Sequence, residues 1–586
     1  MRLRRFALRR LVPTSFLLCD DEQNDTLGCA GHPWATSGFD LSLVKANLYQ
    51  YARPMKHRPF PNRHGKRYGI ERRDFLRYLA AVSAIPHIPT FGAAETALNK
   101  SPKFSSNPFT LGVASGDPEP DGVVIWTRLA PAPLEANSGM PTEAVETRWE
   151  VAEDEAFSKV VKSGTAPAMP QLGHSVHVEV DGLKPHHWYY YRFHAGEESS
   201  PVGRSRTTPP KDDLTKQLRF AFTSCQHYES GFFDAFRHMQ EEDLDLVVQL
   251  GDYIYEGAAG ANRPRKHIGK ECESLDEYRL RYAQYRSDEH LQNAHRLFPW
   301  LVTWDDHEFD NNYADLVSEE EGISPEVFLA RRADAYQAYY EFMPLRRRSF
   351  PQGPHMRLYR SCSFGRLANF HVLDTRQYRS DQPNGDHQKP MNENALNPKA
   401  TMLGAKQENW LTSGLLQSPS TWNILAQQIM IAPLNRGEGD DARYSMDQWP
   451  GCEASRRRLL RFFHERNIPN PVVLTGDIHI NWVNDLQLDF QDPKSPLVGT
   501  EFVGSSITSG GDGGKVIPEY DRAWKQNDFV KWHNTNRGYV TCEVTPLSWT
   551  SHFRTTPFVT KPGSPIETKA SFLVEAGIPG AQKIAG

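Results

Sequence analysis

The stretch LVVQLGDYIYEG (residues 246–257) is an apolar run that stops at Gly251-Asp252, and a second stretch, WDDHEFDNN (residues 304–312), crowds carboxylates and carboxamides together. Carboxylates held close to one another repel, and they resist the loss of their hydration shells. A cluster of this density at the end of a strand therefore requires either open solvent or a bound cation. We interpret it as a cation site.

Strand and helix patterns alternate on both sides of these stretches. Apolar runs that end in polar residues include LRFAFTSC, ANFHVLDTR, TWNILAQQIM and PVVLTGDIH, and helical patterns such as EVFLARRADAYQAYYEF and RRRLLRFFHER lie between them. This alternation predicts a buried α/β core. Ligands of such sheets bind past the carboxyl ends of the strands, so we expect the polar residues after each run to share one site.

The region before this core has a different pattern. Short alternating runs separated by Gly, Pro and Asp, among them GVVIWTRL, ETRWEVAED and HHWYYYRFHAG, predict a small antiparallel β-sandwich. The polar stretch Thr207-Thr208-Pro209-Pro210 marks a linker after it. We therefore predict a sandwich domain at 105–208, an α/β domain at 216–560 and a C-terminal tail at 561–586.

The first 94 residues are predicted to be a leader. Arg72-Arg73, followed by a short apolar stretch and by Gly92-Ala93-Ala94, resembles a bacterial twin-arginine export signal at 71–94. The alternative is a chance arginine pair before a helix. The signal predicts that the twin-arginine export machinery is a partner and that the protein is exported, either periplasmic or extracellular.

Composition limits the classes of function. Hydrophobic residues make up 39% of the 586 and charged residues 24%, and no apolar run is long enough to span a membrane. A formal net charge of −5 offers no global basic surface, so we expect no specific nucleic-acid recognition. Apart from Cys225, which lies in a motif described below, four cysteines follow the leader: Cys272, Cys362, Cys452 and Cys542. Two disulfides and buried free thiols are equally open for them.

Four strand-end motifs make up the predicted site: Ser224-Cys225-Gln226, Gly251-Asp252-Tyr253-Ile254-Tyr255, Trp304-Asp305-Asp306-His307-Glu308 and Gly476-Asp477-Ile478-His479. Each motif alone is weak, because a lone histidine near an apolar segment is more often a hydrogen-bonded core residue. Together they bring thiolate, carboxylate, phenolate and imidazole around one cavity. That combination predicts a polynuclear metal site.

The order of these motifs resembles the calcineurin-like metallophosphatases, and more closely the PhoD family of alkaline phosphatases and phosphodiesterases. The resemblance covers about residues 109–560 and includes GVASGDPEPDGVVIWTRL, FTSCQ, QLGDYIYE, WDDHEFDNN, LDTRQYR, MLGAKQENWL and LTGDIHINW. It implies a four-layer α/β/β/α metallophosphatase domain preceded by the small β-sandwich.

The resemblance also implies a division of the metal ligands. One ferric ion would be held by Cys225, Asp252, Tyr255 and His479, with Asp252 bridging to calcium, and two calcium ions would use Asp306, Asn312 and Asp477. Asp305 and Asn311 are further calcium candidates, because a one-residue shift in a loop exchanges neighbours. The alternatives are an inert buried thiol for Cys225 and a core packing role for Tyr255.

Two further residues are predicted to take part in catalysis. The resemblance implies that His307 approaches the leaving group or the phosphate, and the alternative is that it orients a carboxylate. Arg376 either clamps phosphate oxygens or forms a structural salt bridge. The glycines of SGGDGGK (509–515) lack P-loop spacing and predict at most a flexible rim, and residues 258–275 and 430–455 are candidate lids.

The resulting prediction is a secreted, metal-dependent alkaline phosphatase and phosphodiesterase that hydrolyses phosphomonoesters and phosphodiesters for phosphate acquisition. Metal ions lower the pKa of bound water, so no protein nucleophile is required. Three alternatives stay open. The first is a phospholipase D-type enzyme, which an apolar rim would favour and which aromatic residues such as Trp449 and Trp524 leave open. The others are cleavage of phosphotriesters or sulfate esters, and a non-catalytic exported binding protein.

Overall fold

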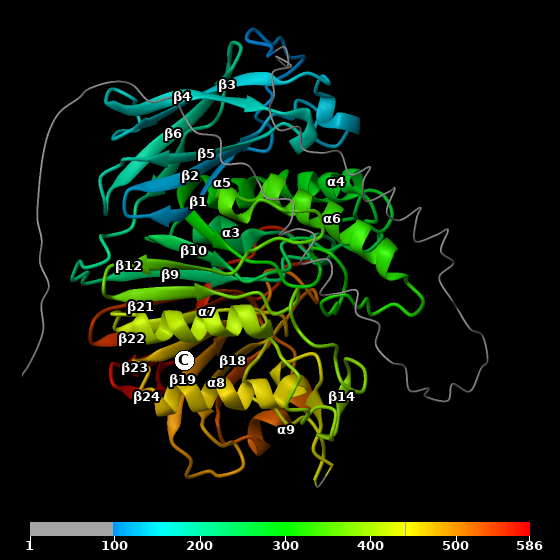
Figure 1. Ribbon diagram of the computed structural model, residues 1–586, viewed down its shortest axis with the longest axis vertical. Helices are drawn as coiled ribbons and strands as arrows, with labels where there is room; N and C mark the ends of the chain where they lie inside the picture. Colours follow the sequence, from blue (N-terminus) through cyan, green and yellow to red (C-terminus); the bar gives the residue numbers. More distant parts are fainter. Residues whose placement is uncertain (1–97, 440) are drawn as a thin grey trace, which may run out of the picture. The chain divides into compact units, whose positions relative to one another are not determined.

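Two β-sheets face each other at the centre of this computed structural model, which describes residues 98–439 and 441–586 (Figure 1). The predicted leader and twin-arginine segment lie outside the described residues. The first sheet has ten strands in the order β24 (Ile578–Ala585), β23 (Glu567–Glu575), β22 (Ser548–Thr556), β21 (Arg537–Val544), β9 (Leu218–Thr223), β10 (Leu246–Gln249), β11 (Pro299–Val302), β1 (Val113–Glu119), β2 (Gly122–Arg128) and β5 (Ser175–Asp181). The second has seven in the order β12 (Arg360–Phe364), β13 (Ala368–Val372), β15 (Trp422–Ala426), β17 (Pro471–Thr475), β19 (Leu497–Val503), β18 (Asn481–Gln487) and β20 (Val530–Asn534).

Helices cover the outer faces of both sheets. Their bounds are α3 (Asp234–Met239), α4 (Leu275–Arg286), α5 (Glu289–Leu297) and α6 (Pro325–Phe342) on the ten-stranded sheet, and α7 (Gly404–Gln417), α8 (Glu453–Glu465) and α9 (Pro518–Gln526) on the seven-stranded sheet. Local sequence sets where several of them begin. Ser274 and Glu277 form a capping box at α4, and Asp288 accepts from two backbone N–H groups at α5.

Three apolar cores separate the four layers. One lies between the ten-stranded sheet and its helices, one between the two sheets, and one between the seven-stranded sheet and its helices. The middle core contains Phe220, Trp422 and Trp549, all fully buried, with the rings of Phe220 and Trp549 5.5 Å apart. Each such side chain contributes on the order of 2 to 3 kcal/mol through burial. The predicted α/β/β/α architecture is confirmed.

The N-terminal sandwich shares a sheet with the α/β domain. Its outer sheet contains β3 (Val145–Ala152), β4 (Val160–Ala168), β6 (Trp188–Ala195), β7 (Glu198–Ser199) and β8 (Gly203–Arg206). Its other layer is formed by β1, β2 and β5, and β1 pairs in parallel with β11 through Ser115 and Pro299. The sandwich at 105–208 is therefore joined to the α/β domain by continuous strand pairing.

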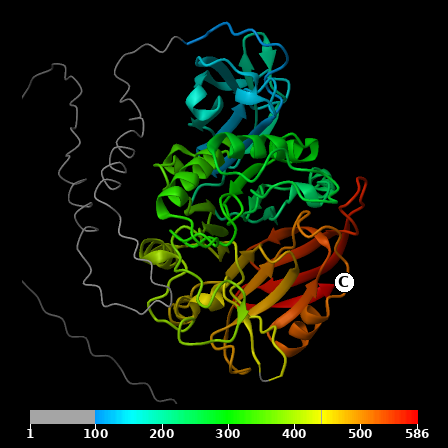
Figure 2. The ribbon, with the colours of Figure 1, turned by 90° about the vertical axis from the view of Figure 1, so that its right-hand side faces the viewer.

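The predicted C-terminal tail at 561–586 is wrong. Strands β23 and β24 extend the ten-stranded sheet, and β23 pairs antiparallel with β22 from Ser548 to Thr555 (red strands in Figure 2). Alternating buried residues such as Ala570, Phe572 and Val574 face the core between the sheets. The α/β domain thus runs to the end of the described chain.

The described cysteines are all free and buried: Cys225, Cys272, Cys362, Cys452 and Cys542. Of the two alternatives for the last four, the structure supports buried thiols.

Among the described residues, no helix combines the length and the apolar character that a membrane crossing requires. A short two-stranded sheet, β14 (Gln388–Lys389) with β16 (Tyr444–Ser445), joins two loops near the edge of the second sheet.

Candidate metal centre

The predicted ligands follow the carboxyl ends of parallel strands in both sheets. In the first sheet, β9, β10 and β11 run parallel and are followed by Cys225, Asp252 and the pair Asp305-Asp306. In the second sheet, β17 is parallel to β15 and is followed by Asp477 and His479. The carboxyl ends of these strands meet, which confirms that residues far apart in the sequence share one site.

The backbone is strained at these strand ends. Five of the predicted ligand residues are non-glycine residues with positive φ: Cys225 at 57°, Asp252 at 55°, Asn312 at 48°, Asp477 at 59° and His479 at 58°. Such conformations cost on the order of 1 to 3 kcal/mol each and persist only where surrounding structure enforces them. The sharp turns aim consecutive polar side chains away from the strands and into the shared cavity.

The ligand atoms fall into three overlapping groups, each with its atoms within 4.8 Å of one another: Cys225 with Asp252 and His479, Asp252 with Asp306 and His307, and Asp305 with Asp306 and Asp477. Asp252 belongs to two groups and Asp306 to two. An ion in one group would therefore share a carboxylate with an ion in the next. This arrangement suits a polynuclear centre.

Within the described part of the chain, three buried carboxylate oxygens have no hydrogen-bond partner: Oδ1 of Asp252, Oδ2 of Asp305 and Oδ1 of Asp306. Leaving a charged acceptor buried without a partner is expensive, and cations remove this cost. Hard carboxylate oxygens are the ligands that calcium and magnesium prefer. The residues present therefore fit bound metal ions.

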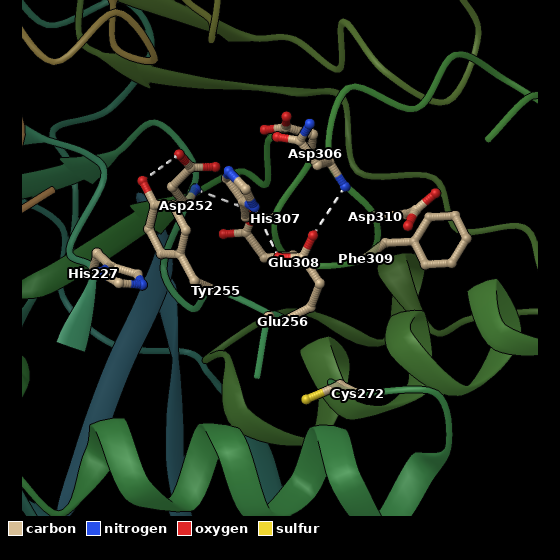
Figure 3. Close-up of polar contacts among 12 residues, drawn as sticks. His227, Asp252, Tyr255, Glu256, Cys272, Asp306, His307, Glu308, Phe309 and Asp310 are labelled. Carbon is tan, nitrogen blue, oxygen red and sulfur yellow. Dashed lines mark hydrogen bonds and ion pairs between the residues drawn. The ribbon is translucent and has the colours of Figure 1, made fainter. Parts of the chain in front are cut away.

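The phenol oxygen of Tyr255 lies among three neighbours, Asp252, His479 and Ser509. Figure 3 shows the contact with Asp252. It donates to Asp252 Oδ2 at 2.7 Å and lies 3.2 Å from His479 Nε2. These separations are those of adjacent ligands on one transition-metal ion with bonds of about 2 Å. The structure thus places the Tyr255 hydroxyl beside Asp252 and His479, which form one group with Cys225.

Burial opposes charge throughout this cavity. It raises the pKa of Cys225, Asp252, Tyr255 and Asp305 well above their usual values, and it raises the pKa of Asp477 to about 7. Neighbouring carboxylates raise the pKa of Asp477 further, above all Asp447. These acids would ionise together only with added positive charge, which metal ions supply.

Arg376 lies among four carboxylates. Its side chain is fully buried, its Nε donates to Asp305 at 2.5 Å, and its two terminal nitrogens donate to Asp447 at 2.7 and 3.0 Å. It also lies within 4 Å of Asp306 and Asp477. These contacts are those of the salt-bridge alternative, because the donors of Arg376 serve carboxylates.

His307 forms a pair with Glu256, a residue that the sequence reasoning missed (Figure 3). Its Nδ1 donates to Glu256 Oε2 at 2.7 Å, and its ring packs against the Tyr255 ring with centroids 4.1 Å apart. Burial opposes protonation of His307, but Glu256, Asp306 and Asp252 outweigh burial and raise its pKa well above its usual value. His307 can thus hold a proton close to the cavity.

Asn311 and Asn312 occupy the turn after His307. The backbone N–H of Asn312 donates to Asp306 Oδ2 at 2.8 Å, and its side-chain amide donates to Asp386 at 2.6 Å. The side chain of Asn311 donates to Glu319 instead. The loop thus keeps Asn312 next to Asp306, whereas the side-chain amide of Asn311 bonds the exposed carboxylate of Glu319.

Glu308 was also missed as a functional residue. Its carboxylate is buried and accepts from three backbone N–H groups, those of Asp252 at 3.1 Å, Tyr253 at 2.6 Å and Asp305 at 2.9 Å. It therefore ties the loop after β10 to the loop after β11. Only its place beside His307 in WDDHEFDNN hinted at this role.

A fourth group of possible ligands, His227, Glu229 and His267, is occupied by internal hydrogen bonds. Glu229 accepts from the backbone N–H groups of Gly260 and His267, and His267 bonds Gly257 O and the Tyr285 hydroxyl at 3.0 Å each. Burial and nearby arginines lower the pKa of His267 to about 2. The group fastens residues 257–267 to the core, so that part of the predicted 258–275 lid is anchored.

Comparisons with known proteins agree with this architecture. The chain matches the family model of the PhoD-like phosphatase over residues 220–553, and that of the PhoD-like phosphatase N-terminal domain over residues 93–209. It is 49% identical over 522 residues to alkaline phosphatase D of Bacillus subtilis (strain 168), covering 88% of this chain and 89% of that protein. A solved structure described as the structure of PhoD superposes with a TM-score of 0.81 at 51% identity, covering 83% of this chain and 94% of the other. The chain therefore belongs to the PhoD-like phosphatase family.

Proposed function

We propose that the protein is a metal-dependent alkaline phosphatase that also hydrolyses phosphodiesters. One observation carries the proposal: unpartnered carboxylate oxygens of Asp252, Asp305 and Asp306 converge where strand ends of both sheets meet. Such a site needs cations, and a cluster of cations suits the anionic substrate and transition state of phosphoryl transfer. The similarity to alkaline phosphatase D supports the same reaction class.

The metals we propose are one ferric ion and two calcium ions. Cys225, Asp252, Tyr255 and His479 combine soft and nitrogen ligands and would hold iron, while Asp306, Asn312 and Asp477, with Asp305 beside them, would hold calcium. When bound, these ions would activate the nucleophile and neutralise charge on the phosphoryl oxygens.

Three side chains hold the reacting groups and the ligand loops in place. Glu256 holds the His307 ring by its Nδ1 proton, which leaves Nε2 to give a proton to the departing alkoxide of a diester. Arg376 keeps the carboxylates of Asp305 and Asp447 in place and supplies fixed positive charge behind them. Glu308 sets the spacing between the loops that carry Asp252 and Asp305.

The cellular role we propose is release of phosphate from environmental esters by an exported enzyme. The twin-arginine pattern at 71–94 motivates export, since that route carries proteins folded with their metals. The lipid-cleaving alternative loses part of its support. Trp449 is fully buried and donates to Gln427, so of the two aromatic residues named for a lipid surface, Trp524, 40% exposed, remains.

The test uses the purified full chain with bis-p-nitrophenyl phosphate and with p-nitrophenyl phosphate. Both should be hydrolysed in calcium, both activities should vanish with a calcium chelator, and both should return when calcium is restored. Hydrolysis of the monoester alone would overturn the diesterase proposal. No hydrolysis of either ester by protein shown to contain iron and calcium would overturn the proposed reaction.

A further inference from the structure

The glycine-rich segment SGGDGGK (509–515) is docked on neighbouring segments through hydrogen bonds of its first half. The N–H of Gly511 donates to Thr508 O at 2.9 Å, and Arg537 Nε donates to Gly511 O at 2.8 Å. Asp512 accepts from the backbone of Val559 and Thr560 at 2.7 and 2.9 Å. Positive φ at Gly510 and Gly511, 85° and 69°, bends the chain back on itself and explains the glycines.

This docking presents the buried hydroxyl of Ser509 to the metal centre. Ser509 Oγ lies 2.7 Å from the phenol oxygen of Tyr255 and 2.7 Å from the backbone oxygen of Cys225. It accepts from the backbone N–H of His227 at 3.2 Å. Ser509 thus contacts the backbone of Cys225, which is one candidate iron ligand, and the phenol oxygen of Tyr255, which is the ligand atom of another.

Counting hydrogens shows which contact changes when a metal binds. Ser509 has one hydroxyl hydrogen, so it donates either to Cys225 O or to Tyr255. The Tyr255 hydroxyl loses its own hydrogen when it ligates a metal, and its neighbours Asp252 and His479 are then turned to the same ion. Cys225 O can release the Ser509 hydrogen, because the backbone N–H groups of Ser509 and Thr508 also point to it, at 3.3 and 3.5 Å.

We infer that Ser509 is a positioning residue that donates a hydrogen bond to the metal-bound oxygen of Tyr255 and so sets the geometry and electronic character of that ligand. The inference rests on the proposed iron site. Partners of metal ligands commonly alter metal affinity or activity by about 10- to 100-fold. The glycine-rich segment thereby has a function: it fixes this donor.

The experiment compares Ser509→Ala with Ser509→Thr, which keeps a hydroxyl, in full-length protein loaded with ferric iron. The matched control is Thr508→Val, next in the chain, whose buried hydroxyl donates to His227 O at 2.7 Å instead. The first readout is the visible charge-transfer absorption from phenolate to ferric iron. The second is iron retention against a chelator, and thermal unfolding identifies any variant that fails to fold.

Loss of the hydrogen bond raises the energy of the phenolate electrons, so Ser509→Ala should shift the band to longer wavelength. It should also lose iron about tenfold faster or more. Ser509→Thr should restore the band, and Thr508→Val should leave it unchanged. An unshifted band and unchanged iron retention in folded Ser509→Ala would overturn the role of Ser509 alone. A wild-type protein with no such band, or the same band unchanged in Tyr255→Phe, would overturn Tyr255 as an iron ligand and this inference with it.

Discussion

The two halves of the metal centre balance charge in different ways. Around Tyr255 the ligands are neutral without a metal: burial raises the pKa of Cys225 and Tyr255 well above their usual values and lowers that of His479 to about 3. Around Asp305 and Asp306 a buried guanidinium, Arg376, already supplies positive charge. The ligands around Tyr255 must lose protons to bind an ion. The negative charge of Asp305 and Asp306 is partly neutralised by Arg376 without any ion.

Because of this difference, mutations in the two halves should have different effects on metal content and on stability. Removing a ligand from the Tyr255 half should affect metal content before stability, because the remaining groups can stay neutral. Removing Arg376 from the acidic half should affect stability at once, because buried carboxylates lose their counter-charge. Asp252, which is grouped with Cys225 and His479 and also with Asp306, should affect both halves together.

The largest effect is expected from Asp252→Ala. It removes the shared carboxylate, so hydrolysis of p-nitrophenyl phosphate should fall to background and both metals should be reduced. Initial rates and elemental analysis by mass spectrometry check this. Substantial activity in the variant would show that the halves do not share Asp252.

Arg376→Met should destabilise the protein by about 3 to 5 kcal/mol, because Asp305 and Asp447 would be left buried and unpaired. Added calcium should recover part of this loss by supplying positive charge. Chemical denaturation with and without calcium measures both. Equal stability of variant and wild type in calcium-free buffer would contradict the assigned role, and Arg366→Met, a change at a surface arginine of the turn after β12, serves as control.

Cys225→Ser should lose iron while keeping calcium, since the thiol belongs to the group with His479 and not to the acidic group. Iron-to-protein and calcium-to-protein ratios check the expectation. Parallel loss of both metals would remove the distinction between the halves.

Calcium affinity should depend on pH through Asp477. Its pKa is raised to about 7 by burial and nearby carboxylates, so below pH 7 the metal-free side chain carries a proton that calcium must displace. Affinity should therefore rise about tenfold per pH unit up to about pH 7 and then level off. Calorimetric titrations from about pH 5.5 to 8 would show this, and Asp477→Asn should bind more weakly without that slope.

The smallest effect is expected from Glu256→Gln. The amide can still contact His307 but no longer stabilises its proton, so turnover should fall about tenfold for esters with poor leaving groups. Nitrophenyl esters, whose leaving group needs little protonation, should change less. An equal loss for both classes would assign Glu256 a structural role instead.

Several elements could be predicted from local pattern alone. Apolar runs that end in Asp252, Asp305-Asp306 and Asp477 indicated strands with their ligands at the carboxyl ends, because strand periodicity and polar termini are local properties. The C-terminal strands were missed. Apolar and polar side chains alternate only weakly in their first residues, and the bounds of β23 depend on its pairing with β22.

By itself, then, the sequence determined the layered α/β fold, the motifs that face the site and the chemistry of their side chains. Only the tertiary structure decided their partners: Arg376 with Asp447, His307 with Glu256, and Ser509 with a phenol 254 residues away in the chain. Periodicity encodes which face of an element is buried. A hydrogen bond between distant segments leaves no periodic signal, because it depends on how the two sheets pack and how each strained turn aims its side chain.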